Sequence, residues 1–132
     1  MSEPKGGTLQ HEVANLLRMA GEDEVDVSPQ WVRERHEAGE IQLIDVREPY
    51  EWAAGHLAGA RHIALEHVAA EASTIDQGTP VVFYCAVGAR SSMAAGAFRR
   101  AGYEAHSMDG GITAWHEQGL PLEPDDGNVA GH

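Results

Sequence analysis

The feature that most constrains the fold is a short, continuous apolar run, Val81-Val82-Phe83-Tyr84. Because neighbouring side chains of a strand point to opposite faces, this run is apolar on both faces, as is typical of a central strand in a parallel sheet. Gly78-Thr79-Pro80 interrupts regular structure before the run, and Cys85, the single cysteine of the chain, follows it. The run therefore predicts a buried strand that brings one thiol to an edge of a sheet.

Strand-like and helix-like segments alternate along the rest of the chain. Ser28 before Pro29 is a favourable helix start, and Gly39, Gly102 and Gly119 are helix stops. The further expected strands are 25–27, 41–46, 60–64 and 103–108, and the expected helices are 29–38, 49–54, 65–73, 91–101 and 112–118. This alternation predicts an α/β fold with three layers, α/β/α, around a central, mostly parallel five-stranded sheet.

The chain divides into three parts. Residues 1–24 are an N-terminal extension with a short amphipathic helix expected at 11–20, and residues 25–123 form one domain. Residues 124–132 are a flexible tail, with fraying expected from Pro121. No signal peptide and no membrane-spanning segment is expected.

Charge and cysteine content limit the partners and the setting. The chain has 9 Lys and Arg against 21 Asp and Glu, a formal net charge of −12, which disfavours nucleic acid and anionic membranes as partners. A single cysteine cannot form an internal disulfide, which fits a reducing, cytoplasmic location. The histidines show no metal-ligand spacing, so neither a metal nor a cofactor is expected.

The segment that follows the central strand is the candidate site, because ligands bind beyond the C-terminal ends of parallel strands. Gly88 allows the loop to wrap so that backbone amides turn toward the sulfur of Cys85, and the helix that begins near Ser91 adds its positive end. These groups favour the thiolate, the reactive form of cysteine. Arg90 offers a planar cation to an oxyanion. The alternative is an inert, buried cysteine. The candidate loop residues are Ala86, Val87, Gly88, Ala89, Arg90 and Ser91.

Two other segments reach the same edge of the predicted sheet. Asp45 and Arg47 end a strand, and an ion pair that braces the loop is favoured over contact with substrate. Gly110-Gly111 is a predicted tight turn that can also form part of the pocket floor. His56 is a possible base, but a structural role is favoured because an ionised cysteine needs none.

Three blocks of the sequence together resemble the single-domain rhodaneses, a sulfurtransferase family. The first block is Asp45-Val46-Arg47-Glu48-Pro49-Tyr50-Glu51-Trp52 together with residues 55–60. The second block is residues 85–91. The third block consists of Gly102-Tyr103, residues 110–115 and residues 119–121. The resemblance covers about residues 25–123. It implies a rhodanese fold and a persulfide on Cys85, formed from a sulfane-sulfur donor such as thiosulfate and passed to a thiol or to cyanide. It further implies that 86–90 form the active-site loop and that Arg90 takes part in substrate recognition.

Differences from the family pattern separate the possible functions. Ala86 stands where many rhodaneses carry a basic residue, which weakens the site for a dianion such as thiosulfate. Four residues separate Cys85 from Arg90, whereas related phosphatases and arsenate reductases have a loop one residue longer. Because the chain lacks a second thiol, an outside acceptor, including a protein thiol, must remove the sulfur. A protein-partner sulfur carrier or binding module is the alternative function, and phosphatase or arsenate reductase activity is a third.

Overall fold

Five strands form the central sheet in the order β1-β6-β5-β2-β4, and every neighbouring pair is parallel. The structure is a computed structural model that describes residues 25–130, so the helix expected at 11–20 lies outside the described residues. The strands are β1 (Asp26–Val27), β2 (Gln42–Asp45), β4 (Arg61–His62), β5 (Val81–Tyr84) and β6 (Ala105–Met108). The apolar run is therefore the central strand, as the sequence predicts.

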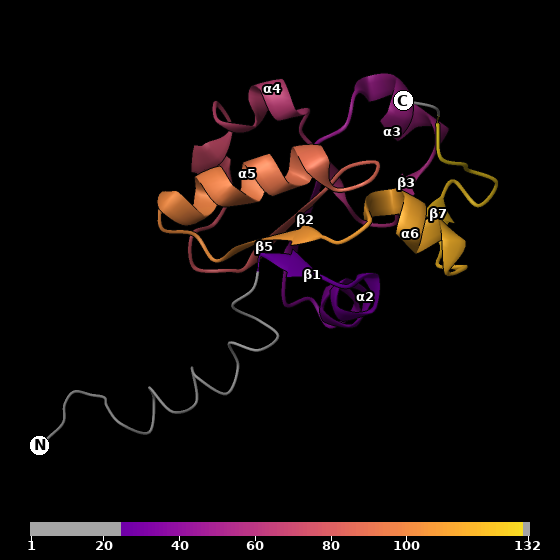
Figure 1. Cartoon of the computed structure of the whole chain (residues 1–132), viewed down its shortest axis with the longest axis horizontal. Coiled ribbons are helices and arrows are strands. Elements are labelled where there is room, and N and C mark those ends of the chain that lie inside the picture. Colours follow the sequence, from indigo (N-terminus) through magenta and orange to yellow (C-terminus); the bar gives the residue numbers. More distant parts are fainter. Residues whose placement is uncertain (1–24, 131–132) are drawn as a thin grey trace, which may run out of the picture.

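Helices cover both faces of this sheet. Figure 1 shows α4 (Leu65–Val68) and α5 (Ala89–Arg100) above the sheet and α2 (Pro29–Glu37) below it. The lower face also carries α6 (Gly111–Glu117), while α3 (Pro49–Ala54) follows β2. The three-layer α/β/α architecture is thus confirmed. Within the described residues, none of these helices has the length and apolar character needed to cross a membrane.

Side chains of β5 alternate between two hydrophobic cores. Val81, Phe83 and the following Cys85 belong to the core beneath α5, together with Ala94 and Phe98 of that helix. Val82 and Tyr84 belong to the other core, which also contains Val32, Ile112 and Trp115. Because this alternation is fixed by the pleat of the strand, the sulfur faces α5 and not α6.

A second, two-stranded sheet departs from the sequence-based expectations. β3 (His56–Leu57) pairs antiparallel with β7 (Leu122–Glu123), although neither segment is among the expected strands and fraying is expected from Pro121. Leu57 and Leu122 lie opposite each other and are both buried in the core beneath α6. Burial of these two leucines explains why the chain stays ordered there. Beyond this sheet, the amide of Asn128 donates to the carbonyl of Ala54 at 2.9 Å.

Several helix ends also differ from their predicted positions. The start of α2 is as predicted, since Ser28 Oγ accepts a hydrogen bond from the amide of Trp31 at 3.0 Å. The helix predicted at 65–73 is instead the short α4 followed by a 3-10 turn at Ala72–Thr74. Val68 is the buried residue of α4, and Ala72 and Ile75 beyond it still pack on the same core, so this segment stays against the core without forming one continuous helix.

Candidate functional site

Cys85 lies directly after β5, almost fully enclosed, with only 1% of its surface exposed. Its sulfur accepts hydrogen bonds from the amides of Gly88 at 3.1 Å and Ser91 at 3.4 Å, and Ser91 Oγ lies 3.5 Å away. An inert core cysteine is equally enclosed, but it packs among apolar groups without donors aimed at it. The convergence of amides on the sulfur therefore favours the reactive interpretation of this residue.

These donors change the ionisation of the thiol. Burial raises the pKa of Cys85, but hydrogen bonds from the Ser91 hydroxyl and from the amides of Ser91, Gly88 and Arg90 outweigh it, so the pKa lies below its ordinary value. Ser91 Oγ also donates to the carbonyl of Gly88 at 3.2 Å and lies 2.7 Å from Ser107 Oγ on β6, so this hydroxyl is held in place beside the sulfur. A lowered pKa increases the thiolate fraction at neutral pH.

The loop is shaped by an early helix start. Gly88 adopts a left-handed conformation with φ of 114° and caps α5, which begins at Ala89 rather than at Ser91 as the sequence predicts. The first amides of a helix have no acceptor within the helix. Because Ser91 lies in this first turn, its amide is available to Cys85 Sγ. Of the other loop residues, Ala86 is buried, whereas Val87 and Ala89 are exposed.

The beginning of α6 holds the carbonyl side of the loop. The amide of Ile112 donates to the carbonyl of Cys85 at 2.9 Å, and the amide of Thr113 donates to that of Ala86 at 3.1 Å. Gly111 lies so close that a Cβ there would collide with both carbonyl oxygens. With the carbonyls engaged on this side, the amides of the loop turn toward the sulfur. The predicted Gly110-Gly111 turn thus lies directly against the loop.

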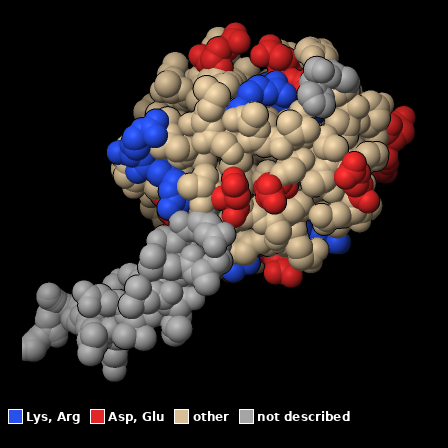
Figure 2. Space-filling view, viewed as in Figure 1, with Lys and Arg blue, Asp and Glu red and all other residues tan. Residues whose placement is uncertain are grey.

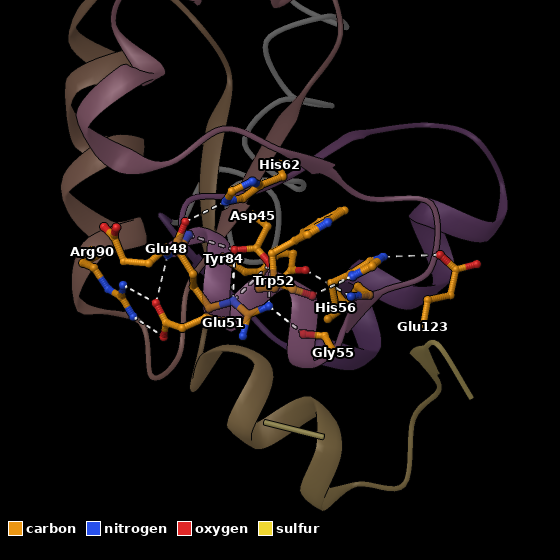
Figure 3. A network of polar contacts seen from close by, with 12 residues as sticks. Asp45, Glu48, Glu51, Trp52, Gly55, His56, His62, Tyr84, Arg90 and Glu123 are labelled. Atoms are coloured by element: carbon orange, nitrogen blue, oxygen red, sulfur yellow. Dashed lines mark hydrogen bonds and ion pairs between the residues drawn. The ribbon is translucent and has the colours of Figure 1, made fainter. Parts of the chain in front are cut away.

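Arg90 is not the free cation that the sequence suggests. Its guanidinium donates to both carboxylate oxygens of Glu51, at 2.9 and 3.1 Å, as Figure 3 shows. The Arg90 side chain is 30% exposed and that of Glu51 only 1%, so the buried carboxylate requires this cation. Burial raises the pKa of Glu51, but hydrogen bonds from Arg90 and the amide of Glu48, with the nearby positive charges, hold it below its ordinary value.

Glu51 is the site residue that sequence reasoning missed. A local signal exists, because Glu51 lies in the first turn of α3 after Pro49 and accepts the amide of Glu48 at 2.9 Å, an arrangement typical of a helix start. That signal predicts a capping role and no more. The pairing with Arg90 joins residues 39 positions apart, which no local pattern reveals.

Asp45 and Arg47 form the ion pair that the sequence favours, but the pair does not brace the loop around Cys85. Arg47 Nη2 lies 2.7 Å from Asp45 Oδ2, with both side chains fully buried, and it also donates to the carbonyl of Gly55 at 2.8 Å. The pair lies beside Tyr84, whose ring is 5.6 Å from the guanidinium carbon, on the opposite face of β5 from Cys85. It therefore positions the segment after α3 and does not reach the sulfur.

His56 also takes part in a structural cluster. Its ring stacks on Trp52 with centroids 3.5 Å apart, and its Nδ1 lies 3.0 Å from the carbonyl oxygen of Trp52. Its Nε2 faces Glu123 of β7 at 3.6 Å, as drawn in Figure 3. These contacts join α3 to the small sheet, which supports the structural interpretation of His56.

Comparison with known proteins places this geometry in one family. The model of the Rhodanese-like domain matches residues 28–118. The thiosulfate sulfurtransferase GlpE of Pseudomonas aeruginosa is 37% identical over 67% of this chain and 81% of its own length. An HTH-type transcriptional regulator of Mycobacterium tuberculosis is 39% identical over 74% of this chain, but the match covers only 43% of that protein.

Solved structures agree with the sequence matches. A rhodanese-like domain from an Anabaena protein superposes with a TM-score of 0.68 at 27% identity, covering 83% of this chain and 93% of that one. A rhodanese-related protein from Thermoplasma volcanium shares the fold with a TM-score of 0.70 at 24% identity, covering 75% of this chain and 97% of that chain. Together with the parallel sheet and the loop that encloses Cys85, these matches establish that the chain belongs to the rhodanese-like domain family.

Proposed function

We propose that this protein is a rhodanese-type sulfurtransferase that carries sulfane sulfur as a persulfide on Cys85. The observation that carries the proposal is the enclosure of Sγ by hydrogen-bond donors. The amides of Gly88 and Ser91 lie 3.1 and 3.4 Å from the sulfur, and the pKa of the thiol is lowered despite its burial. The lowered pKa increases the fraction of thiolate, the nucleophilic form of cysteine.

Two displacements at sulfur complete the reaction. In the first, the Cys85 thiolate attacks the outer sulfur of a donor such as thiosulfate, a new S–S bond forms, and sulfite leaves with the electron pair of the broken bond. In the second, an acceptor such as cyanide attacks the outer sulfur of the persulfide, and Cys85 regains its electron pair as thiolate. Thiocyanate is then released, and no oxidant, metal or cofactor takes part.

Donor choice depends on the charge at the mouth of the site. A relative is named thiosulfate sulfurtransferase, which supports thiosulfate as a donor here. The Arg90 guanidinium is engaged by Glu51, and position 86 carries alanine, so little free positive charge remains to attract a dianion. We therefore expect thiosulfate to react with a high KM, and donors of lower charge, such as persulfides, to react with a lower one. A single thiol of this kind also fits the reducing cytoplasm.

Intact mass measurement tests the proposal directly. The full chain is incubated with thiosulfate and, separately, with a polysulfide, and we expect a gain of one sulfur atom that cyanide removes. Cys85→Ser is the matched variant, because it replaces the sulfur with an oxygen of similar size, and it should gain no sulfur. Steady-state release of thiocyanate should be lost in the same variant.

Absence of a sulfur adduct with either donor would refute the proposal. Turnover of an aryl phosphate by the same sample would then favour the phosphatase alternative. An adduct that forms on Cys85 but is discharged by neither cyanide nor small thiols would favour a protein-partner sulfur carrier.

A further inference from the structure

Three large apolar side chains are exposed on the segments that carry Cys85, Arg90 and Glu51. Tyr50 is 59% exposed, Val87 54% and Met93 66%, and these are the exposed large hydrophobic residues of the part of the chain that the structure describes. Scattered exposed apolar residues are common on soluble proteins. Here, however, Val87 and Met93 belong to the loop and helix that follow Cys85, and Tyr50 belongs to the helix that carries Glu51, the partner of Arg90.

The three residues lie close in sequence to the Arg90–Glu51 pair, which connects α3 to α5. Tyr50 precedes Glu51, whose carboxylate is bound by Arg90. Met93 lies three residues after Arg90 on α5, a spacing that places both on one side of the helix. Val87 precedes Gly88, whose amide donates a hydrogen bond to the sulfur of Cys85. We call Tyr50, Val87 and Met93 the apolar rim.

Acidic groups flank the apolar rim. Glu48 is exposed beside Tyr50, and Asp109 is exposed beside Gly110, which lies against Gly88. On the Glu48 side, a hollow of about 510 Å³ is also lined by Glu66, Glu71 and Arg61, and this arginine is itself paired with Glu71 at 3.4 Å. Carboxylates are also spread over the face of the molecule in Figure 2, in line with the net charge of −12. The surroundings of the entrance therefore favour positive charge on whatever binds there.

The depth of the sulfur restricts the shape of the acceptor. Cys85 is 1% exposed, and a persulfide extends outward by only one S–S bond, about 2 Å. A protein acceptor must therefore present its sulfur on a projecting segment and not on a flat surface.

We propose that the apolar rim docks a protein partner whose cysteine projects on a loop, with apolar side chains next to it and basic side chains further out. This inference rests on the proposed function. The partner's thiolate attacks the outer sulfur of the Cys85 persulfide, a new S–S bond forms on the partner, and Cys85 leaves as thiolate. The partner thus becomes a persulfide, and atoms, charge and electrons balance without another reactant.

Synthetic thiol peptides test the proposal without knowledge of the natural partner. The full chain is first loaded with sulfur, and transfer is followed by mass to Lys-Leu-Cys-Phe-Lys, Glu-Leu-Cys-Phe-Glu and Lys-Ser-Cys-Ser-Lys, with cyanide as a reference. We expect the apolar, basic peptide to react about tenfold faster than either of the others, the scale set by burying one large apolar side chain. Its advantage over the acidic peptide should shrink at high salt.

Two variants connect the preference to the apolar rim. Tyr50→Ser combined with Met93→Gln should remove most of the advantage of the apolar peptides and leave discharge by cyanide unchanged. Ala97→Gln, on an exposed position of the same helix, is the matched control and should keep the preference.

The outcomes separate this inference from the proposed function. If Cys85 never gains sulfur, both fail. If it gains sulfur and cyanide removes it, but the three peptides react at equal rates or the double variant retains the preference, only the docking proposal is overturned. Equally fast transfer to benzyl mercaptan, without dependence on salt, would assign the apolar rim to small apolar thiols and would also overturn it.

Discussion

The protein contains two arginine–carboxylate pairs that use the same chemistry in different surroundings. Arg47 and Asp45 are fully buried at 2.7 Å, with additional hydrogen bonds to the backbone. Arg90 and Glu51 approach at 2.9 Å, but the arginine is 30% exposed. No ligand can reach the first pair, whereas the second lies at the entrance to the reactive sulfur.

This difference shows how burial decides what an ion pair contributes. A fully buried pair holds together the segments to which it is hydrogen-bonded. Removal of one charge leaves the other buried without a partner, which strongly destabilises the fold. A pair at an entrance affects both the stability of the fold and the charge that the site presents to substrate. Glu51 neutralises the cation of the loop, and that explains why this site differs electrostatically from one with a free arginine.

The largest effect is expected from Asp45→Asn. This change leaves the Arg47 guanidinium buried without its counter-charge, and Nη1 of Arg47 already lacks a hydrogen-bond partner in the described residues. We expect a loss of about 3–5 kcal/mol in the free energy of unfolding, measured by urea denaturation. Asp125→Asn, at an exposed position, is the control. A loss below about 1 kcal/mol would mean that the two pairs are equivalent.

A smaller effect on stability and a distinct effect on activity are expected from Glu51→Gln. The amide oxygen can still accept the hydrogen bond from Glu48, while Arg90 becomes available to anions. We expect the KM for thiosulfate to fall about fivefold, the scale of one screened charge nearby, with a stability loss of about 1 kcal/mol. Steady-state kinetics with thiosulfate and with a neutral donor separate the effect of charge on KM from a general effect on activity. An unchanged KM would show that Glu51 does not control the charge at the entrance.

Low pH should weaken the contribution of Glu51 to the free energy of unfolding. The pKa of this carboxyl in the folded protein lies below its ordinary value of 4.5, so its stabilisation is complete above that value and is lost as the pH falls through the folded pKa. The difference in unfolding free energy between the wild type and Glu51→Gln should therefore shrink as the pH falls below 4.5 through the folded pKa. Denaturation at several pH values measures it, with Glu40→Gln as an exposed control. A constant difference would contradict the expected linkage.

The smallest effect is expected from Arg90→Lys. Lysine keeps the charge but cannot bind both oxygens of Glu51 in the planar geometry of arginine. At this partly exposed position we expect a stability loss within about 1 kcal/mol, whereas Arg47→Lys in the buried pair should cost more than about 2 kcal/mol. Thermal and urea unfolding of both variants provide the measurement. Equal losses would remove the distinction between the pairs.

The parts of the molecule that were predictable carry local signals. The apolar run 81–84 identified the central strand, and Gly88 identified the turn that directs amides to Cys85. The Arg90–Glu51 pair was not predictable, because the residues are distant in sequence and either side chain alone is compatible with a solvated surface. The β3–β7 sheet was missed for a similar reason, since each strand has two residues and owes its order to leucines buried by distant elements.

The contact between α6 and the loop joins residues that are synthesised at different times. Cys85 emerges from the ribosome well before Gly111, Ile112 and Thr113, whose backbone fits against the carbonyls of residues 85 and 86. Until those later residues are synthesised, the carbonyls of residues 85 and 86 lack these hydrogen-bond partners. The folded arrangement of the loop around Cys85 therefore depends on a segment that is synthesised after the cysteine itself.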